Sequence, residues 1–138
     1  MNIEQRLSQE WQTLQNNHEQ YEKGSLLIKL TCLVAWAGGL AANIAPVWIA
    51  LLVLLFWLQD GIYKTYQARL AQRLLRVESL IRENPPNAQP MQLHSEWLSQ
   101  RKRGAGLLLE YALSACRPTV AYPYALLLLL SGVEEFLF

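Results

Sequence analysis

Residues 53–83 read VLLFWLQDGIYKTYQARLAQRLLRVESLIRE, a stretch that begins as an apolar run and ends as a charged amphipathic segment. It contains no proline and one glycine, Gly61, which weakens a helix by about 1 kcal/mol without ending it. Upstream of it, Pro46 suits the first position of a helix. The pattern therefore predicts one helix over residues 46–83, about 57 Å long, that leaves an apolar medium and continues into water.

The apolar half of this helix has a partner earlier in the chain. Residues 26–44, LLIKLTCLVAWAGGLAANI, carry a single charge, Lys29, and would span about 28 Å as a helix, close to the hydrocarbon thickness of a bilayer. Lys29 lies one turn from the end, where we expect it to reach back to the membrane surface. The intervening NIAP turn predicts a transmembrane hairpin over residues 25–63.

Small residues in the first span indicate a packing face. Small side chains four positions apart let a second helix approach closely in lipid. The predicted helix-packing residues are Ala35, Gly38, Gly39 and Ala42.

The polar halves of both helices carry apolar stripes at steps of three and four residues. Antiparallel helices that leave the membrane together would continue their contact in water, after a bend expected at Gly24-Ser25. The stripes are also wider than one helix–helix seam requires, which predicts a protein partner or a second copy of this chain. The predicted contact residues are Leu7, Trp11, Leu14, Tyr66, Leu70, Leu74, Val77 and Ile81.

The remainder of the chain predicts a third span. Three prolines in the segment NPPNAQP end the long helix. A further helix is expected from near Met91, with residues 92–116 lying in the plane of the membrane surface as an amphipathic segment. Arg117-Pro118 would make a corner, and residues 119–133 would cross. A re-entrant pair is the alternative, so two or four crossings stay open.

Basic residues are concentrated in one region although the net charge of the 138-residue chain is only +1. Residues 59–104 hold eight Lys or Arg against four Asp or Glu, which predicts that this region and the N-terminus are cytoplasmic and the C-terminus periplasmic. The small net charge and the membrane-proximal position argue against nucleic acid. The residues expected to face lipid headgroups or an acidic partner are Arg69, Arg73, Arg76, Arg101, Lys102 and Arg103.

Three ionisable residues in or beside apolar segments are candidates for a functional role: Asp60, Glu110 and Arg117. Asp60 ends the second span, and its simplest role is to face headgroups or Lys64, four positions on. Glu110 on an in-plane helix would face water. If that helix is instead buried, Glu110 becomes a residue of an ion path or a subunit contact, paired with Arg117.

Catalytic signatures are missing from the sequence. There is no P-loop, GxGxxG, HExxH or GxSxG, and the two cysteines lack metal-type spacing. We therefore expect no catalytic residue, no cofactor, no metal site and no small-molecule substrate.

The stretch LLFWLQDGIYKTYQARLAQRLLR resembles a pattern in uncharacterised small bacterial inner-membrane proteins. In these, a span ends in aromatic-x-x-Asp and continues as a Tyr- and Arg-bearing helix, with a later short span. The chain departs from that pattern at Gly61-Ile62-Tyr63 and Gln67, where an aromatic pair and an acidic residue would stand. The resemblance implies a bacterial inner-membrane location and no particular activity.

Together these patterns predict one all-α membrane domain over residues 1–138 with three transmembrane helices. Its parts are a cytoplasmic amphipathic helix (1–24), a transmembrane hairpin (25–63), a basic cytoplasmic region (64–104), and an in-plane helix with the third span (105–138). The predicted function is a non-enzymatic binding or structural subunit of a membrane assembly, through self-association or partner docking. The alternative is an oligomeric channel or membrane-disrupting effector of a bacterial defence or toxin system.

Overall fold

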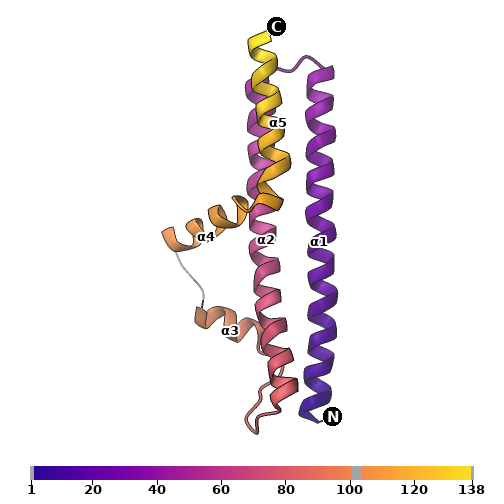
Figure 1. The fold of residues 1–138 in the computed structure, drawn as a ribbon, viewed down its shortest axis with the longest axis vertical. Coiled ribbons are helices and arrows are strands. Elements are labelled where there is room, and N and C mark those ends of the chain that lie inside the picture. Colours follow the sequence, from indigo (N-terminus) through magenta and orange to yellow (C-terminus); the bar gives the residue numbers. More distant parts are fainter. Residues whose placement is uncertain (1, 101–103, 138) are drawn as a thin grey trace.

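A computed structural model describes residues 2–100 and 104–137, and this part of the chain is helical with short connections. Two long helices, α1 (Ile3–Ala41) and α2 (Pro46–Glu83), lie side by side and antiparallel (Figure 1). A third, α5 (Pro118–Leu137), packs along the half of the pair nearest their connecting turn. The shorter α3 (Leu93–Gln100) and α4 (Ala105–Ala115) project sideways from α2.

Three of these helices are long and apolar enough to cross a membrane: α1, α2 and α5. The chain is therefore an all-helical protein with the character of a multi-pass membrane protein, as the sequence predicts at this level. We call residues 24–63 and 118–137 the span bundle, and residues 3–23 and 64–100 the arm. Figure 1 shows the arm extending below the level at which α5 begins.

Local sequence accounts for the ends of the long helices. Asn2 caps α1 through its side chain, which accepts from the backbone of Gln5 in a capping box. Asn43 adopts a left-handed conformation (φ 56°) in the turn, and Pro46 opens α2. Asn84, also left-handed (φ 46°), ends α2 one residue after Glu83, so α2 has the predicted bounds.

The bend expected at Gly24-Ser25 is wrong, because α1 continues through both residues without interruption. Gly24 serves a different purpose. A Cβ atom there would lie 2.7 Å from the ring of Tyr63, so the glycine makes room for an aromatic side chain of α2. Tyr63 in turn packs against Tyr21, with ring centroids 5.1 Å apart. The glycine thus permits close approach of two straight helices rather than a change of direction.

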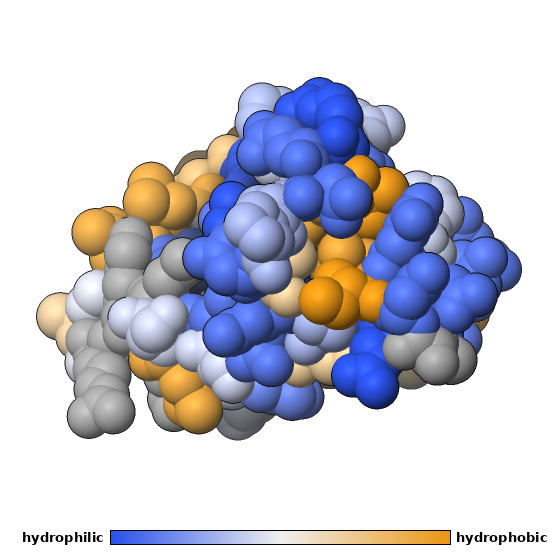
Figure 2. Space-filling model, turned by 90° about the horizontal axis from the view of Figure 1, so that it is seen from below, coloured by the Kyte–Doolittle hydropathy of each residue, from blue (hydrophilic) through white to orange (hydrophobic). Residues whose placement is uncertain are grey.

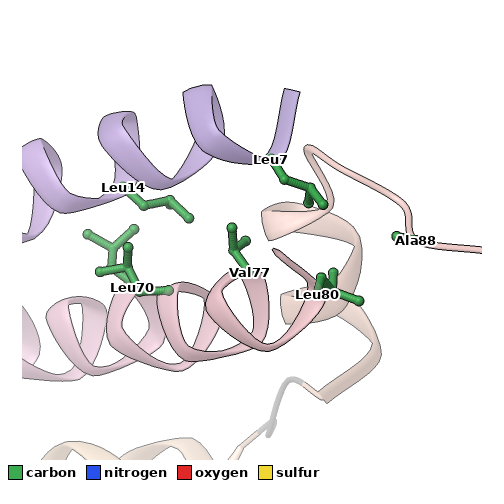
Figure 3. Close-up of a cluster of buried hydrophobic side chains, with 7 residues drawn as sticks. Leu7, Leu14, Leu70, Val77, Leu80 and Ala88 are labelled. Carbon is green, nitrogen blue, oxygen red and sulfur yellow. The ribbon is translucent and has the colours of Figure 1, made fainter. Parts of the chain in front are cut away.

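The arm has its own apolar core between α1 and α2 (Figure 3). Leu14 lies opposite Leu70, and Leu7 lies opposite Val77 and Leu80, in the order expected for antiparallel helices. Ala88, from the connection after α2, covers the far end of this core. The buried stripes are therefore covered within the chain itself, because the proline-rich connection folds back over them.

The single in-plane helix expected over residues 92–116 is instead two helices, α3 and α4. Gly104 has a φ of 59°, a left-handed conformation that cannot continue a helix, and it directly precedes α4. Arg101, Lys102 and Arg103 lie outside the described residues. The predicted corner is present, since α4 ends at Ala115 and α5 begins at Pro118.

Candidate functional site

Four side chains form a polar centre inside the span bundle, and we call Ser25, Lys29, Asp60 and Tyr124 the bundle centre. The Asp60 side chain is completely buried, accepts two hydrogen bonds and forms one salt bridge. Lys29 Nζ lies 2.7 Å from its Oδ2, Tyr124 Oη donates to the same oxygen at 2.9 Å, and Ser25 Oγ donates to Oδ1 at 2.5 Å. Lys29 also donates to Ser25 at 2.7 Å. One carboxylate therefore joins α1, α2 and α5.

This arrangement corrects two expectations from the sequence. Asp60 faces neither headgroups nor Lys64, which instead donates to Glu22 at 3.0 Å and to Gln67 at 2.9 Å. Lys29, expected to reach toward the membrane surface, pairs with Asp60. A charge at this depth is costly unless it is paired and hydrogen-bonded, and the bundle centre supplies both conditions.

Two tryptophans add polar contacts around the bundle centre. Trp36 on α1 donates to Ser131 on α5 at 2.8 Å. Trp57 on α2 donates to the carbonyl of Ala115 at 2.8 Å, at the end of α4. Its ring also stacks on Tyr124, with centroids 6.2 Å apart. In a membrane, an apolar side chain gains little by moving from lipid to a neighbouring helix. Polar contacts such as these therefore favour α5 packed on α1 and α2 over α5 surrounded by lipid.

Helix α4 docks on α2 through small residues. A Cβ atom on Gly61 would lie 2.9 Å from the Cβ of Ala115, so only glycine permits this approach. One turn further along, Thr65 donates to Ser114 at 2.9 Å. Gly61 was expected only to weaken α2, and its contact with α4 is a further reason for its position.

A second charge cluster, the arm centre, consists of the buried Glu10 and Arg73 and the partly exposed Glu96. Arg73 is 2% exposed; its Nε and Nη2 donate to Glu10 at 2.7 and 3.1 Å, and its Nη1 donates to Glu96 at 2.6 Å. Glu10 also accepts from the backbone of Met91 at 2.6 Å. Burial lowers the pKa of Arg73, but the two carboxylates outweigh burial and raise it. Arg73, predicted to face headgroups, is therefore engaged inside the arm.

Arg69 occupies an aromatic site between α2, α3 and α4. Its guanidinium carbon lies 5.2 Å from the ring centroid of Tyr66 and 4.7 Å from that of Trp97. Glu110 on α4 approaches Arg69 to 3.8 Å. The pairing of Glu110 with Arg117, expected if the helix were buried, is not the one observed, and Arg117 is exposed at the corner before α5.

The remaining predicted residues have varied positions. Gly39 is buried, and a Cβ atom there would lie 3.1 Å from Ile49, so this residue packs on α2. Gly38 has open space around it, while Ala42 is exposed and Ala35 half-buried. Arg76 is exposed. The buried contact residues are Leu7, Leu14, Leu70, Leu74 and Val77, with Trp11 and Ile81 at the margin of the same core.

One exposed acidic residue is also perturbed. Glu22 accepts from Gln67 at 2.6 Å and from Lys64 at 3.0 Å. These hydrogen bonds, Gln67 first and Lys64 second, hold the pKa of Glu22 below its usual value. The contact ties α1 to α2 at the boundary between the span bundle and the arm.

Sequence reasoning missed Ser25, Tyr124, Glu10 and Glu96 as partners of the buried charges. Two sequence spacings point to these roles. Ser25 and Lys29 are one helical turn apart, so they can contact the same partner. Glu10 lies three residues from Leu7, which places it on the buried side of α1. Nothing in the sequence, however, shows that Arg73 pairs with Glu96 and Glu10, which lie 23 and 63 residues away from it along the chain.

Within residues 2–100 and 104–137, no three His, Cys, Asp or Glu side chains are grouped in a way that could hold a metal ion. No family model, no curated protein and no solved structure matches this chain.

Proposed function

We propose that this chain is a non-enzymatic membrane protein that serves as a structural or binding subunit of a membrane-associated assembly. The span bundle anchors it, and the arm presents a surface to a protein partner or to a second copy. The supporting observation is the arm centre. Buried salt bridges lock α1, α2 and the connection after α2 into one rigid unit outside the spans, and a rigid surface loses little entropy on binding.

The proposed location is a bacterial inner membrane, with the arm and the N-terminus cytoplasmic and the C-terminus periplasmic. The basic bias of residues 59–104 supports this orientation. In this placement α4 lies in the plane of the cytoplasmic surface. Its exposed Leu108, Leu109 and Leu113 support that position, because they would enter the acyl boundary while α4 stays docked on α2.

The docking surface is not the stripe of buried leucines, since the chain covers it. Exposed apolar residues of the arm are better candidates, above all Leu75 on α2, at 67% exposed, and Leu98 on α3, at 61%. Within the bilayer, the open side of Gly38 and the exposed Ala42 offer a surface for a neighbouring helix.

The test is cross-linking in native membranes followed by purification in mild detergent. We expect a dimer, a higher oligomer or a reproducible protein partner in the wild type. Replacing Leu75 and Leu98 with Lys should lower its yield severalfold, whereas Gln72→Lys, an exposed charge control on the same helix, should not. A monomer with no cross-linked partner would contradict the proposal.

The bundle centre supports a second candidate function, an oligomeric channel or membrane-disrupting effector. Ionisable groups inside a membrane mark ion pathways, and Lys29 is 21% exposed while its partner is buried. Several copies would be needed to line a pore. Ion flux from liposomes carrying the wild type, abolished by Lys29→Met, would favour this function, and liposomes that stay tight would exclude it.

A further inference from the structure

We propose that a groove between α2 and α3 binds the phosphate and glycerol portion of an anionic phospholipid. The groove has a volume of about 240 Å³. Tyr66 and Arg69 line it from α2, and Leu93, His94 and Trp97 line it from α3. Figure 2 views the molecule from the arm end, where most of the surface is hydrophilic and apolar atoms gather in separate patches.

The groove begins just beyond the headgroup layer and within reach of it, an argument that depends on the membrane placement proposed above. The second span ends near Tyr63, and Arg69 lies six residues further along α2, or about 9 Å at 1.5 Å per residue. The headgroup layer adds about 5–7 Å on each side of the hydrocarbon core. An arginine side chain at that height reaches a lipid phosphate without leaving its helix.

Arg69 is incompletely neutralised by the residues around it. Glu110 lies 3.8 Å away, too far for a hydrogen bond. Within residues 2–100 and 104–137, Arg69 Nη1 is buried without a hydrogen-bond acceptor. A buried polar group of this kind calls for an acceptor that the described residues do not supply. Phosphate is a preferred acceptor for a guanidinium, which can bind it through two parallel hydrogen bonds.

The size and lining of the groove favour a lipid over a partner helix. A helix is about 10–12 Å across, so a hollow of about 240 Å³ admits one or two of its side chains at most. A phosphate attached to glycerol fits this volume, and the aromatic walls suit the less polar carbons beside it. The exposed leucines lie on α4, whose Glu110 approaches Arg69 to 3.8 Å, so a membrane surface that these leucines enter would lie close to Arg69.

The experiment measures lipid retention by native mass spectrometry of the full chain in mild detergent. Phosphatidylglycerol, phosphatidylcholine and inorganic phosphate are added separately. We expect retention of phosphatidylglycerol at least tenfold above phosphatidylcholine, and little binding of phosphate alone. Arg69→Gln should lower phosphatidylglycerol retention about tenfold, the loss of a hydrogen bond to a charged group. Arg69→Lys, which keeps the charge but loses the planar contact, should give an intermediate value.

Arg82→Gln is the matched control, because it removes the same charge from the same helix at an exposed position outside the groove. Equal losses in the Arg69→Gln and Arg82→Gln variants would overturn the proposal in favour of general surface charge. Equal retention of both lipids, or phosphate binding as strong as that of the lipid, would overturn it as well. An acidic peptide that displaces phosphatidylglycerol only from the wild type would show that the groove serves a protein partner instead. Membrane fractionation distinguishes failure of the lipid-groove proposal from failure of the proposed membrane location. A protein that is absent from the membrane fraction would contradict the membrane location as well as the groove.

Discussion

Asp60 shows how one residue can connect three helices of this protein. Its carboxylate is completely buried, and its donors come from α1 and α5. In a low-dielectric surrounding the removal of one partner leaves an uncompensated charge, whereas the removal of both does not. Single and paired substitutions should therefore behave differently.

The first prediction uses the native Cys32, which is buried beside Val120 and Tyr124 of α5. In a Cys116→Ser background, Cys32 should react slowly with N-ethylmaleimide in micelles. Asp60→Ala should undock α5 and accelerate labelling at least tenfold, because a broken buried pair costs about 3–5 kcal/mol. In the double variant Lys29→Met, Asp60→Leu, the labelling rate of Cys32 should be closer to that of the wild type. Equal labelling in all three proteins would show that the bundle centre does not hold α5.

The second prediction concerns the arm centre. Arg73→Met leaves Glu10 buried without its cation, so the arm should lose about 3–5 kcal/mol of stability and become sensitive to protease. The exposed Arg76→Met is the matched control and should change stability by less than about 0.5 kcal/mol. Protease sensitivity is measured by limited proteolysis, and stability by thermal unfolding in detergent, for both variants. Similar curves for the two variants would mean that Arg73 contributes no more than a surface arginine.

At the scale of the helices, two glycines have roles that depend on the neighbouring element. Gly24 admits the ring of Tyr63, and Gly61 admits the end of α4. Neither glycine interrupts its helix. Each glycine contributes by letting a side chain or helix pack closely against it. The effect of replacing it on stability therefore cannot be judged from helix propensity alone.

The third prediction compares Gly61→Ala with Gly38→Ala. Both substitutions gain about 1 kcal/mol of helix propensity, but only the Cβ at position 61 meets α4, at 2.9 Å, while position 38 has open space. We expect a lower melting temperature for Gly61→Ala and an unchanged or higher one for Gly38→Ala, measured in the same detergent. An increase for both would indicate that α4 does not pack on Gly61.

The fourth prediction tests the register of the arm. Leu14 and Leu70 lie opposite each other in the arm core (Figure 3), while Ile81 lies about three turns further along α2. Cysteines at 14 and 70 should form a disulfide more readily than cysteines at 14 and 81. The reverse ranking, seen on a reducing and non-reducing gel pair, would require a different pairing of α1 and α2.

At the scale of the whole molecule, the ends of the chain lie at opposite ends of the long axis (Figure 1). The arm and the N-terminus are at one end. The C-terminal end of α5 lies near the turn between α1 and α2, at the other end. If all three candidate spans cross, the two ends face different compartments.

The fifth prediction follows from this arrangement. Single cysteines at positions 87 and 138, each in a background without native cysteines, should differ in labelling by an impermeant maleimide in intact cells. Position 138 should react from outside, and position 87 only after the membrane is opened. Labelling of both from the same side would replace the three-span topology with two or four crossings.

The bounds of α2 and the path of the connection after it show which parts of the fold the sequence predicts and which it does not. The helical stripe of residues 53–83, Pro46 and the prolines of NPPNAQP are local signals, and α2 has the bounds that they predict. The fold-back of the connection after α2 depends on contacts with the distant α1, such as the hydrogen bond from Met91 to Glu10. The wide stripe therefore predicts a surface for a partner, although the chain itself buries much of it and leaves Tyr66 and Leu75 exposed.

The sequence by itself determined the all-helical class, the three apolar helices and the extension of two of them beyond the apolar region, because periodicity and hydropathy act over a few turns. Only the tertiary structure decided that Lys29 neutralises Asp60, that Arg73 is buried between Glu10 and Glu96, and that α4 rests on Gly61. The physical reason is that a charge is matched by whichever group lies nearest in space, and helices far apart in sequence supply that group.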